Sequence, residues 1–330
     1  MRLLSDIFSG EMTLQDKSFL SYEDIRLKKE KYKVNILALG DVGGTLLLAM
    51  KLLGGEIIDS IGICDISEKV LARYEMEMNQ ISWPFPDEDD SLSNHLPKVE
   101  IISQDKLFDC DCFVFCASKG VPPVGNEQKD VRMVQYEANK DLVQNYAKLA
   151  KDVDFKGIFA VVSDPVDPLC MAAVKGGLSK SQVRGFGLGV MNGRARYFAS
   201  KDEKFKSYLS EGRAFGPHGN DLVIANSIEN YNDEISKELT NLTVNSNLKT
   251  RELGFKPYIA PAVSSGAMSI ISMLSGKWHY SSICFGDAFL GMKNRLCHSG
   301  TLVENIPLNE TLFSRIETAL NNLRNIKWFI

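Results

Sequence analysis

The fold is decided by the stretch Ala38-Leu39-Gly40-Asp41-Val42-Gly43-Gly44-Thr45. An apolar run over residues 34–39 leads into it, and an apolar stretch over residues 45–53 follows it. This order predicts a buried parallel strand, a tight turn and a helix N-terminus, where backbone N–H groups can hold a pyrophosphate. Ala38 stands where the first of three glycines is usual, and its small side chain still permits the turn.

A second apolar run, over residues 61–64, ends at Asp65, which lies 22 residues after Gly43. An acid at the end of the second strand accepts hydrogen bonds from a ribose diol, and its charge would repel a 2′-phosphate. Together with the glycine turn, Asp65 predicts a site for NAD rather than NADP. An ordinary strand-to-helix turn is the alternative interpretation.

Composition narrows the class of protein. The chain has 330 residues, of which 44% are hydrophobic, and a formal net charge of −4. This length suits one large α/β unit or two domains, and the charge argues against a nucleic-acid or anionic-membrane surface. No apolar run is long enough to span a membrane. Seven cysteines without a secretory start favour a reducing compartment, so we expect a cytoplasmic protein.

Three cysteines share one face of a predicted strand: Cys110, Cys112 and Cys116. A metal site there would need a second set of ligands, which the sequence does not show. We therefore expect buried thiols that pack like small apolar side chains, and no metal.

The chain divides into three regions. Residues 1–31 are polar and charged, and we expect an N-terminal arm that could pack on a partner subunit. From residue 32 to residue 165, strands and helices alternate, as in a doubly wound parallel sheet of the Rossmann type. The expected strands are 34–39, 61–65, 100–103, 112–116 and 157–163, and the expected helices are 42–53, 68–80 and a long one ending near residue 152.

The pattern changes after Pro165, so residues 166–330 are expected to form a substrate domain of the α+β class. The expected helices are 168–175, 193–200, 221–225, 233–250, 263–274 and an amphipathic one at the C-terminus, and short strands are expected at 281–285, 290–293 and 301–304. The boundary near Pro165 lies at the carboxyl edge of the sheet, where doubly wound folds bind ligands.

Three more segments carry candidate site residues. Arg132 is followed seven residues later by Asn139, the run Asn192-Gly193-Arg194-Ala195-Arg196 lies further along, and Gly216-Pro217-His218-Gly219-Asn220 comes third. Taken in order with the glycine turn, Asp65 and the Asp164-Pro165 pair, these segments resemble the lactate/malate dehydrogenase family. The resemblance covers the chain from about residue 32 to the C-terminal helix.

The resemblance implies that hydride from NADH reduces a ketone to a secondary alcohol. His218 matches the histidine that protonates the forming alkoxide, and its intrinsic pKa near neutrality suits that task. Arg194 matches the arginine that grips the substrate carboxylate, since a planar guanidinium binds a carboxylate bidentately. Arg132 matches a loop arginine that closes over the site and polarises the carbonyl. The bond before Pro165 resembles one that is cis in the family.

The resemblance also implies a cofactor site and an assembly. Asn139 matches a position near the cofactor, and we expect a homodimer or homotetramer. The expected NAD contacts are Gly40, Asp41, Val42, Gly43, Asp65, Ala117, Ser118, Asn139 and Ser163.

Two positions depart from the family pattern. The aspartate that orients the histidine should lie three residues before the gripping arginine, but this position is Met191. The usual asparagine before Pro165 is Asp164. We hypothesise that the carboxylate has moved, so that Asp164 stabilises a protonated His218. Asn192 is a candidate substrate contact, or else caps a helix that opens at Gly193.

The substrate stays open at this point. The loop over residues 117–132 is about five residues longer than the commonest family form, so the register of its specificity position is ambiguous among Lys119, Asn126, Gln128 and Lys129. We expect a dehydrogenase for a small carboxylate-bearing 2-hydroxy or 2-keto compound. The alternatives are a non-catalytic dinucleotide-binding or assembly protein, and a reductase of an amine-bearing or imine substrate that is attracted by Asp164.

Overall fold

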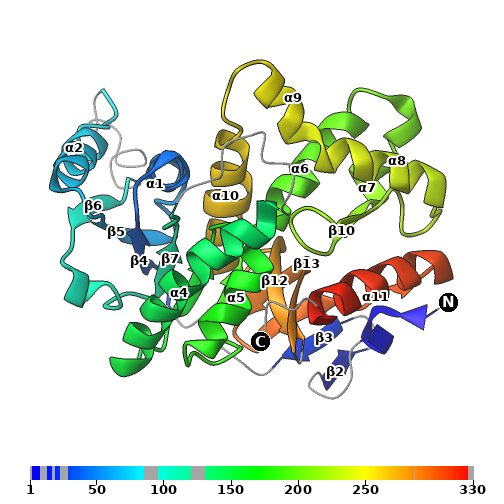
Figure 1. Ribbon diagram of the computed structural model, residues 1–330, viewed down its shortest axis with the longest axis horizontal. Coiled ribbons are helices and arrows are strands. Elements are labelled where there is room, and N and C mark those ends of the chain that lie inside the picture. The colour runs from blue at the N-terminus through cyan, green and yellow to red at the C-terminus, as the bar shows by residue number, and fades with distance from the viewer. Residues whose placement is uncertain are drawn as a thin grey trace.

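The computed structural model describes residues 2–7, 13–16, 19–22, 29–84, 96–119, 131–285 and 287–325. Within these ranges one sheet of 11 strands runs through the molecule, with helices packed on both faces (Figure 1). Its strand order is β2-β3-β14-β13-β12-β9-β8-β7-β4-β5-β6.

The half of the sheet from β9 to β6 is parallel. Its strands are β4 (Tyr32–Leu37), β5 (Ile58–Cys64), β6 (Lys98–Ile101), β7 (Cys112–Phe115), β8 (Ile158–Val161) and β9 (Val183–Gly185). The chain winds in one direction through β4, β5 and β6 and in the other through β7, β8 and β9, so the order reverses between β4 and β7. The predicted doubly wound sheet is therefore confirmed, and ligands bind such sheets at the reversal.

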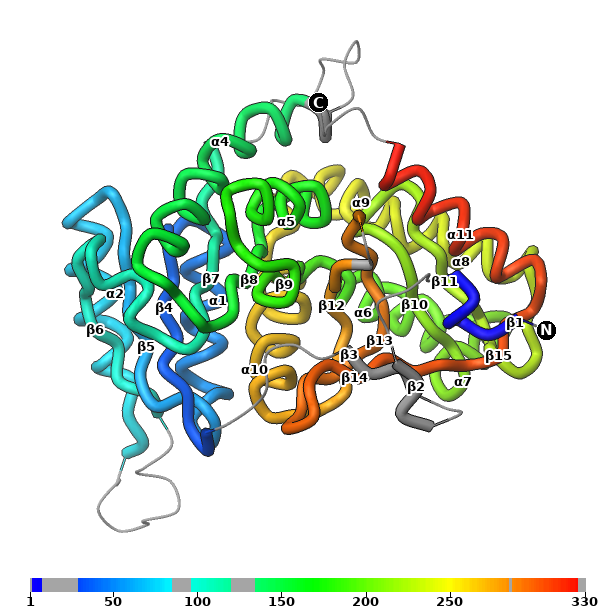
Figure 2. Tube along the Cα trace, turned by 90° about the horizontal axis from the view of Figure 1, so that it is seen from below, coloured from blue at the N-terminus to red at the C-terminus, as the bar shows by residue number. Residues whose placement is uncertain are grey.

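Alternation along β7 shows how the two faces are covered. Cys112 and Val114 belong to an apolar cluster with α1 (Asp41–Leu53) and α10 (Met268–Leu274), whereas Phe113 and Phe115 belong to a cluster with α4 and α5. Side chains of a strand alternate between faces, so a fully apolar strand is buried on both. Figure 2 shows α4 and α5 on one side of the strands and α10 on the other. The helices of the parallel half are α1, α2 (Glu68–Asn79), α4 (Val131–Asp152) and α5 (Val166–Lys175).

The other half of the sheet is antiparallel. It continues from β9 through β12 (His279–Phe285), β13 (Ala288–Cys297) and β14 (Gly300–Glu304). The remaining helices of this region are α6 (Leu188–Ala199), α7 (Tyr208–Glu211), α8 (Asp233–Val244), α9 (Ser246–Glu252), the π-helix η4 (Pro261–Ala267) and α11 (Glu310–Asn325).

The described parts of the N-terminal arm pair with this same chain. β1 (Arg2–Leu3) pairs with β15 (Pro307–Leu308), and β3 (Phe19–Tyr22) pairs with β14 and with β2 (Thr13–Asp16). The guanidinium carbon of Arg2 also lies 3.6 Å from the ring centre of Phe313 in α11. Cation–π contact and strand pairing hold the described arm on the C-terminal region.

Several predicted elements were wrong in kind or extent. Residues 221–225 are not helical: Val223–Ala225 form β11, which pairs with β10 (Arg213–Phe215), and Asp221 has a left-handed backbone with φ of 65°. A buried three-residue apolar run gives no periodicity that separates strand from helix. The helix expected at 193–200 begins earlier, at Leu188. Glycines at its start interrupt the apolar pattern from which the first turns could have been predicted. The helix expected at 233–250 divides at Asn245.

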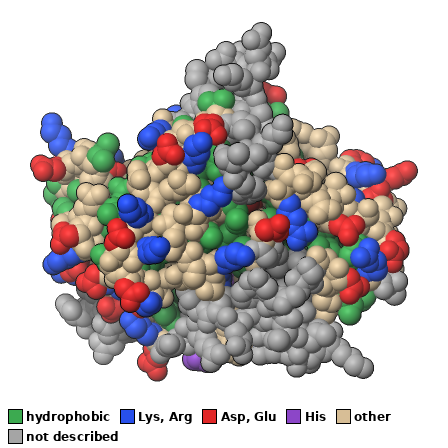
Figure 3. All heavy atoms as spheres, turned by 60° about the horizontal axis from the view of Figure 1, so that its bottom comes forward, with side chains coloured by type: hydrophobic (Ala, Val, Ile, Leu, Met, Phe, Trp, Pro, Cys, Tyr) green, Lys and Arg blue, Asp and Glu red, His purple; other side chains and the backbone are tan. Residues whose placement is uncertain are grey.

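The surface is mixed in charge. On the face drawn in Figure 3, basic and acidic side chains are interspersed over the described residues rather than gathered by sign. None of the helices in the described ranges combines the length and the apolarity that crossing a bilayer requires.

Candidate functional site

The site begins at the turn between β4 and α1. Ala38 adopts a left-handed backbone with φ of 72°, a conformation that is rare for a residue with a side chain. A Cβ at Gly43 would collide with the carbonyl oxygen of Ala38, so the helix can approach the turn only because this residue is glycine. The turn therefore presents the first N–H groups of α1 at the carboxyl edge of the sheet.

These N–H groups are suited to an anion. The N-cap Gly40 supplies no capping side chain, and a Cβ built there would meet no atom within 4 Å. The side chain of Asp41 is drawn outward by Lys256, whose ammonium lies 2.8 Å from its carboxylate. A helix N-terminus with open space and no side-chain cap is a favourable site for a phosphate.

Asp65 lies at the end of β5, where the sequence predicts an acid for the ribose. Its carboxylate accepts hydrogen bonds from the backbone N–H of Leu39 at 2.7 Å and of Ser67 at 3.0 Å. These bonds fix its orientation and leave further lone pairs for a ligand. Ile66 beside it is fully exposed, so an apolar side chain stands next to the acid.

Asn139 joins two loops at the carboxyl ends of β7 and β8. It is fully buried, its amide donates to the hydroxyl of Ser118 at 3.3 Å and to the carbonyl of Asp164 at 3.2 Å, and its oxygen accepts from the backbone N–H of Lys119. Ser163 adds a hydrogen bond to the carbonyl of Ala117 at 2.8 Å. Four of the predicted cofactor contacts thus lie together in one network.

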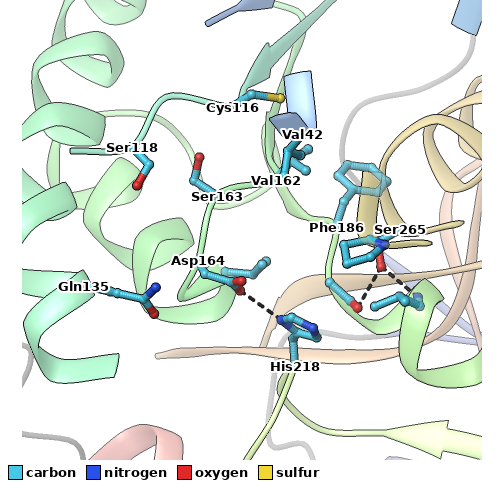
Figure 4. Close-up of a pocket in the computed structure, with 14 residues that line it drawn as sticks. Val42, Cys116, Ser118, Gln135, Val162, Ser163, Asp164, Phe186, His218 and Ser265 are labelled. Carbon is cyan, nitrogen blue, oxygen red and sulfur yellow. Dashed lines mark hydrogen bonds and ion pairs between the residues drawn. The ribbon is translucent and has the colours of Figure 1, made fainter. Parts of the chain in front are cut away.

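A pocket opens at the reversal of the strand order, beside this network (Figure 4). Its apolar walls come from α1, α5, α6 and η4 and from the segments that follow β7, β8 and β9. Its polar groups come from the segments after β7 and β8, from α4, from η4 and from His218. The lining residues are Val42, Cys116, Ser118, Gln135, Val162, Ser163, Asp164, Val166, Phe186, Gly187, Val190, His218, Pro261 and Ser265.

His218 and Asp164 meet in this pocket. Nδ1 of the imidazole lies 2.9 Å from Oδ1 of the carboxylate, as Figure 4 shows, and the side chains are 17% and 47% exposed. The peptide bond between Asp164 and Pro165 is cis, as predicted. The other ring nitrogen, Nε2, is buried and has no hydrogen-bond partner within the described ranges. The pairing that the moved-carboxylate hypothesis requires is present, with one ring nitrogen left for a ligand.

A second carboxylate lies behind His218. Asp167, at the second position of α5, is 2% exposed. It accepts hydrogen bonds from the backbone N–H of His218 and from the hydroxyl of Ser282, and burial raises its pKa to about 6. His218 therefore contacts two carboxylates, Asp164 through its ring and Asp167 through its backbone, of which the sequence indicated the first.

Arg194 lies on α6, one turn after the pocket residue Val190. Burial lowers the pKa of the guanidinium, and the charge of Asp164 acts in the opposite sense, which places the two groups within electrostatic reach. Among the described residues its only hydrogen-bond contact is Nη1 to the sulfur of Met191 at 3.7 Å, and no described carboxylate pairs with it within 4.0 Å. A partly buried guanidinium without a carboxylate partner favours an anionic ligand.

Ser265 fastens the start of α6. Its hydroxyl accepts from the backbone N–H of Val190 at 2.7 Å and donates to the carbonyl of Gly187 at 2.8 Å. Ser265 belongs to η4, and π-helical turns are frequent at functional sites. Through this contact, η4 positions the helix that carries Arg194.

The other predicted residues lie elsewhere or outside the described residues. Asn192 is neither a cap nor in the pocket lining: it lies inside α6, and its amide oxygen accepts from the hydroxyl of Tyr208 at 3.0 Å. Arg132 is the second residue of α4, but its side chain lies outside the described part. The loop candidates Asn126, Gln128 and Lys129 lie outside the described residues altogether.

Sequence reasoning missed Gln135, Asp167, Phe186 and Ser265. Gln135 follows Arg132 by three residues and precedes Asn139 by four, so helical spacing places it on their face of α4. Asp167 follows Asp164 by three residues at the start of a helix. Both spacings are readable in the sequence, whereas Phe186 and Ser265 carry no local signal.

The cysteines of the sheet are not arranged for chemistry. Cys112 is fully buried, burial raises its thiol pKa well above the usual value, and burial raises the pKa of Cys116 to about 12. Within the described ranges, no three His, Cys, Asp or Glu side chains gather as a metal site would require.

Known proteins similar to this chain are lactate and malate dehydrogenases. It is 27% identical to an L-lactate dehydrogenase of Treponema denticola over 194 residues, which is 58% of this chain and 56%, little more than half, of that protein. It is 25% identical to a malate dehydrogenase of Bacteroides fragilis over 287 residues, which is 79% of this chain and 87% of that protein. No protein-family model matches the chain.

Solved structures show the same fold. A lactate dehydrogenase from a Medee basin deep-sea metagenome library superposes with a TM-score of 0.70 at 20% identity, covering 90% of this chain and 98% of that one. A malate dehydrogenase from Archaeoglobus fulgidus, solved in complex with NADH, gives 0.68 at 17% identity, covering 88% and 97%. The chain is thus similar in sequence to lactate and malate dehydrogenases and has the fold that their solved structures show.

Proposed function

We propose that the protein transfers hydride between NAD and a small carboxylate-bearing 2-hydroxy or 2-keto compound. One observation carries the proposal: a guanidinium without a described carboxylate partner, Arg194, and an imidazole–carboxylate pair, His218 and Asp164, lie within electrostatic reach at the carboxyl edge of a doubly wound sheet. Such an arrangement can grip a carboxylate and exchange a proton at the neighbouring carbon.

The residues present fit NAD. The uncapped N-terminus of α1 suits a pyrophosphate, and the oriented carboxylate of Asp65 suits a ribose diol. When bound, the nicotinamide supplies or accepts the hydride. Ser118, Asn139 and Ser163 would border its pocket, and Asp65 would disfavour the 2′-phosphate of NADP.

The chain's own groups handle binding and the proton. Arg194 holds the substrate carboxylate and thereby sets the carbonyl beside His218. The imidazole donates its Nδ1 proton in a hydrogen bond to Asp164. Nε2 is therefore the nitrogen that gives a proton to the forming alkoxide, or takes it in the reverse direction. Arg132 is proposed, from the resemblance alone, to polarise the carbonyl.

Gln135 bears on the choice of substrate. It lines the pocket from α4 (Figure 4), whereas Arg194 belongs to α6. A substrate held by its carboxylate at Arg194 and by its carbonyl at His218 extends its remaining substituent towards Gln135. An amide there favours a substituent that forms hydrogen bonds over a plain alkyl group.

A second candidate reaction is reduction of an amine-bearing or imine substrate. It is favoured by the carboxylate of Asp164, which lines the pocket and is 47% exposed there. An anion beside the reacting carbon stabilises a cationic group and disfavours a neutral ketone.

The test is turnover of NADH with a panel of 2-keto acids and amine-bearing keto acids or imines, followed by loss of the reduced-nicotinamide absorbance. Turnover of 2-keto acids supports the proposal, and turnover of amine-bearing substrates alone supports the second candidate. Binding of NADH without turnover of any substrate would support a non-catalytic dinucleotide-binding protein instead.

Arg194→Met, with Arg196→Met as its matched control, assigns the carboxylate site. Arg196 is exposed, and its guanidinium donates to the carbonyl of Leu209 instead of facing the pocket. We expect Arg194→Met to raise the KM for the keto acid by about 100-fold or more, because a charge-assisted bidentate contact is lost. Arg196→Met should leave it within about twofold, and equal effects of both variants would contradict the assignment.

We also propose a homo-oligomer. Large apolar side chains are exposed on α1 and around η4, which pack against each other: Leu52 and Leu53 on α1, and Ile259 and Met268 near η4, are 50% to 63% exposed. Exposed apolar patches of this kind mark association surfaces. Light scattering at several concentrations tests this, and a monomer at all of them would contradict it.

A further inference from the structure

Asp167 is a buried acid that the proposed reaction does not yet use. It lies in the first turn of α5, three residues after Asp164, and only 2% of it is exposed. Acidic side chains are almost never fully buried unless something pairs with them. Its surroundings therefore need an explanation.

The partners of Asp167 tie it to His218. Its carboxylate accepts a hydrogen bond from the backbone N–H of His218 and another from the hydroxyl of Ser282 on β12, and its charge acts directly on the His218 imidazole. Its Oδ1 atom is buried without a partner within the described ranges. An incompletely satisfied buried carboxylate stabilises a positive charge that forms beside it.

The two carboxylates near His218 differ in how deeply they are buried. The side chain of Asp164 is 47% exposed, so water screens its charge, although it forms the direct bond to Nδ1. Asp167 lies in the interior, where the same charge acts through a much lower effective dielectric. Asp164 is thus well placed to orient the ring, and Asp167 is well placed to supply the field.

We propose that Asp167 is a positioning residue that works with Asp164: Asp164 orients the imidazole of His218, and Asp167 anchors its backbone and stabilises its protonated form. The pair takes the place of the single aspartate that the family pattern would put at Met191. The inference about catalysis rests on the function proposed above, whereas the effect on His218 itself does not.

The charge state of Asp167 supports this division. Because burial raises its pKa to about 6, Asp167 is an anion above that pH and neutral below it. The other titratable groups nearby are the thiol of Cys170, which burial keeps protonated, and beyond it Cys284 and Arg184. Arg194 acts on Asp164 from α6. Among the residues that the structure describes, Asp164 and Asp167 are the acids that act on His218 above about pH 6.

The test is an NMR titration of His218 in the full-length protein. The chain has four histidines, so His218→Gln identifies the signal. We expect Asp167→Asn to lower the His218 pKa by about one unit, and by at least as much as Asp164→Asn does. Asp59→Asn, a control at an exposed position of β5, should leave it unchanged. An unchanged His218 pKa in Asp167→Asn would overturn the proposal.

Ser282→Ala keeps the test decisive if Asp167→Asn does not fold. This variant removes one donor from the carboxylate, which raises the pKa of Asp167 and weakens its charge near neutral pH. The His218 pKa should then fall in the same direction by a smaller amount, and an unchanged value would overturn the proposal.

Turnover gives an independent readout. Asp167→Asn should lower kcat by about tenfold or more near neutral pH, while the KM for the keto acid stays within about threefold because Arg194 is untouched. A lowered His218 pKa in a protein that turns over no substrate would leave the inference standing and refute the proposed function. Normal keto-acid turnover with an unchanged His218 pKa would do the reverse.

Discussion

Nδ1 of His218 lies 2.9 Å from Oδ1 of Asp164, although 54 residues separate them in the sequence. Asp164 belongs to the turn after β8, and His218 follows β10. The fold brings them together at the carboxyl edge of the sheet, where the position usual for the orienting aspartate holds Met191. A carboxylate from another segment thus reaches the imidazole of His218.

Replacing Asp164 tests its part in proton transfer. In Asp164→Asn the imidazole loses its anionic partner, so we expect kcat to fall by about 100-fold near neutral pH and the pH–rate profile to move. Affinity for NADH, measured by fluorescence titration, should stay within about threefold. If both the rate and its pH dependence match the wild type, the carboxylate has no such part.

Replacing Asp65 tests the choice of cofactor. Asp65→Ala removes a ribose acceptor and the two backbone contacts to Leu39 and Ser67. We expect NADH to bind about 10- to 100-fold more weakly, with a smaller effect on NADPH because a repulsive charge is also removed. Asp59→Ala, an exposed residue of the same strand, is the control. Equal losses for both cofactors would contradict the assignment.

Ala38 offers a test of the turn through stability. Its left-handed backbone costs about 1 kcal/mol that glycine avoids, and the greater unfolded-state freedom of glycine offsets part of this gain. We expect Ala38→Gly to leave the free energy of unfolding unchanged or to raise it by up to about 1 kcal/mol. Ala72→Gly, on the exposed face of α2, should lower it by about 1 kcal/mol. If urea unfolding shows that both variants lose the same free energy of unfolding, the backbone of Ala38 is not strained.

The pH dependence of stability follows from Asp167. Its pKa is about 6 in the folded protein against 3.8 for the free side chain, so between these values the folded state binds the extra proton. Stability from this group is therefore present at low pH and is lost as pH rises towards 6, by on the order of 3 kcal/mol in total. Relative to the wild type, Asp167→Asn should gain that amount between about pH 4 and pH 7. Urea unfolding curves whose difference does not change with pH would contradict this.

His279 changes the stability with pH in the opposite direction to Asp167. It is buried, and its pKa is lowered to about 4 in the folded protein, so the unfolded state binds more protons between 4 and 6.5. Its contribution is lost as pH falls, and it offsets that of Asp167 in the wild type. Acid unfolding should therefore steepen in Asp167→Asn, because the contribution of His279 is no longer offset by that of Asp167.

The parallel half of the fold could be predicted because its signals are local. Each strand is a short apolar run beside a turn or an amphipathic helix, and Gly40, Gly43 and Asp65 mark one turn and the strand end beside it. Residues 221–225 were misread because β11 exists only through its pairing with β10, which no local pattern records. The described strands of the N-terminal arm also form by pairing with strands that are distant in the sequence, so no local pattern predicts them.

Site residues could be predicted from the sequence only where the chemistry of the side chain itself defines the role. The paired change at Asp164 and Met191 pointed to the contact with His218. The spacing of Asp167 from Asp164 was readable, but its role was not, because its partners, the backbone N–H of His218 and the hydroxyl of Ser282, lie far along the chain. The interpretation of Asn192 as a helix cap was wrong because the start of α6 was set five residues too late, at Gly193 instead of Leu188.

The most direct test of the account is a crystal structure with NADH and oxamate, an isostere of pyruvate that accepts no hydride. We predict that the oxamate carboxylate lies on the guanidinium of Arg194, that its carbonyl oxygen lies within hydrogen-bond distance of a His218 ring nitrogen, and that Asp164 holds the other nitrogen. Oxamate bound away from Arg194, or an imidazole turned out of the pocket that holds the nicotinamide, would contradict the account.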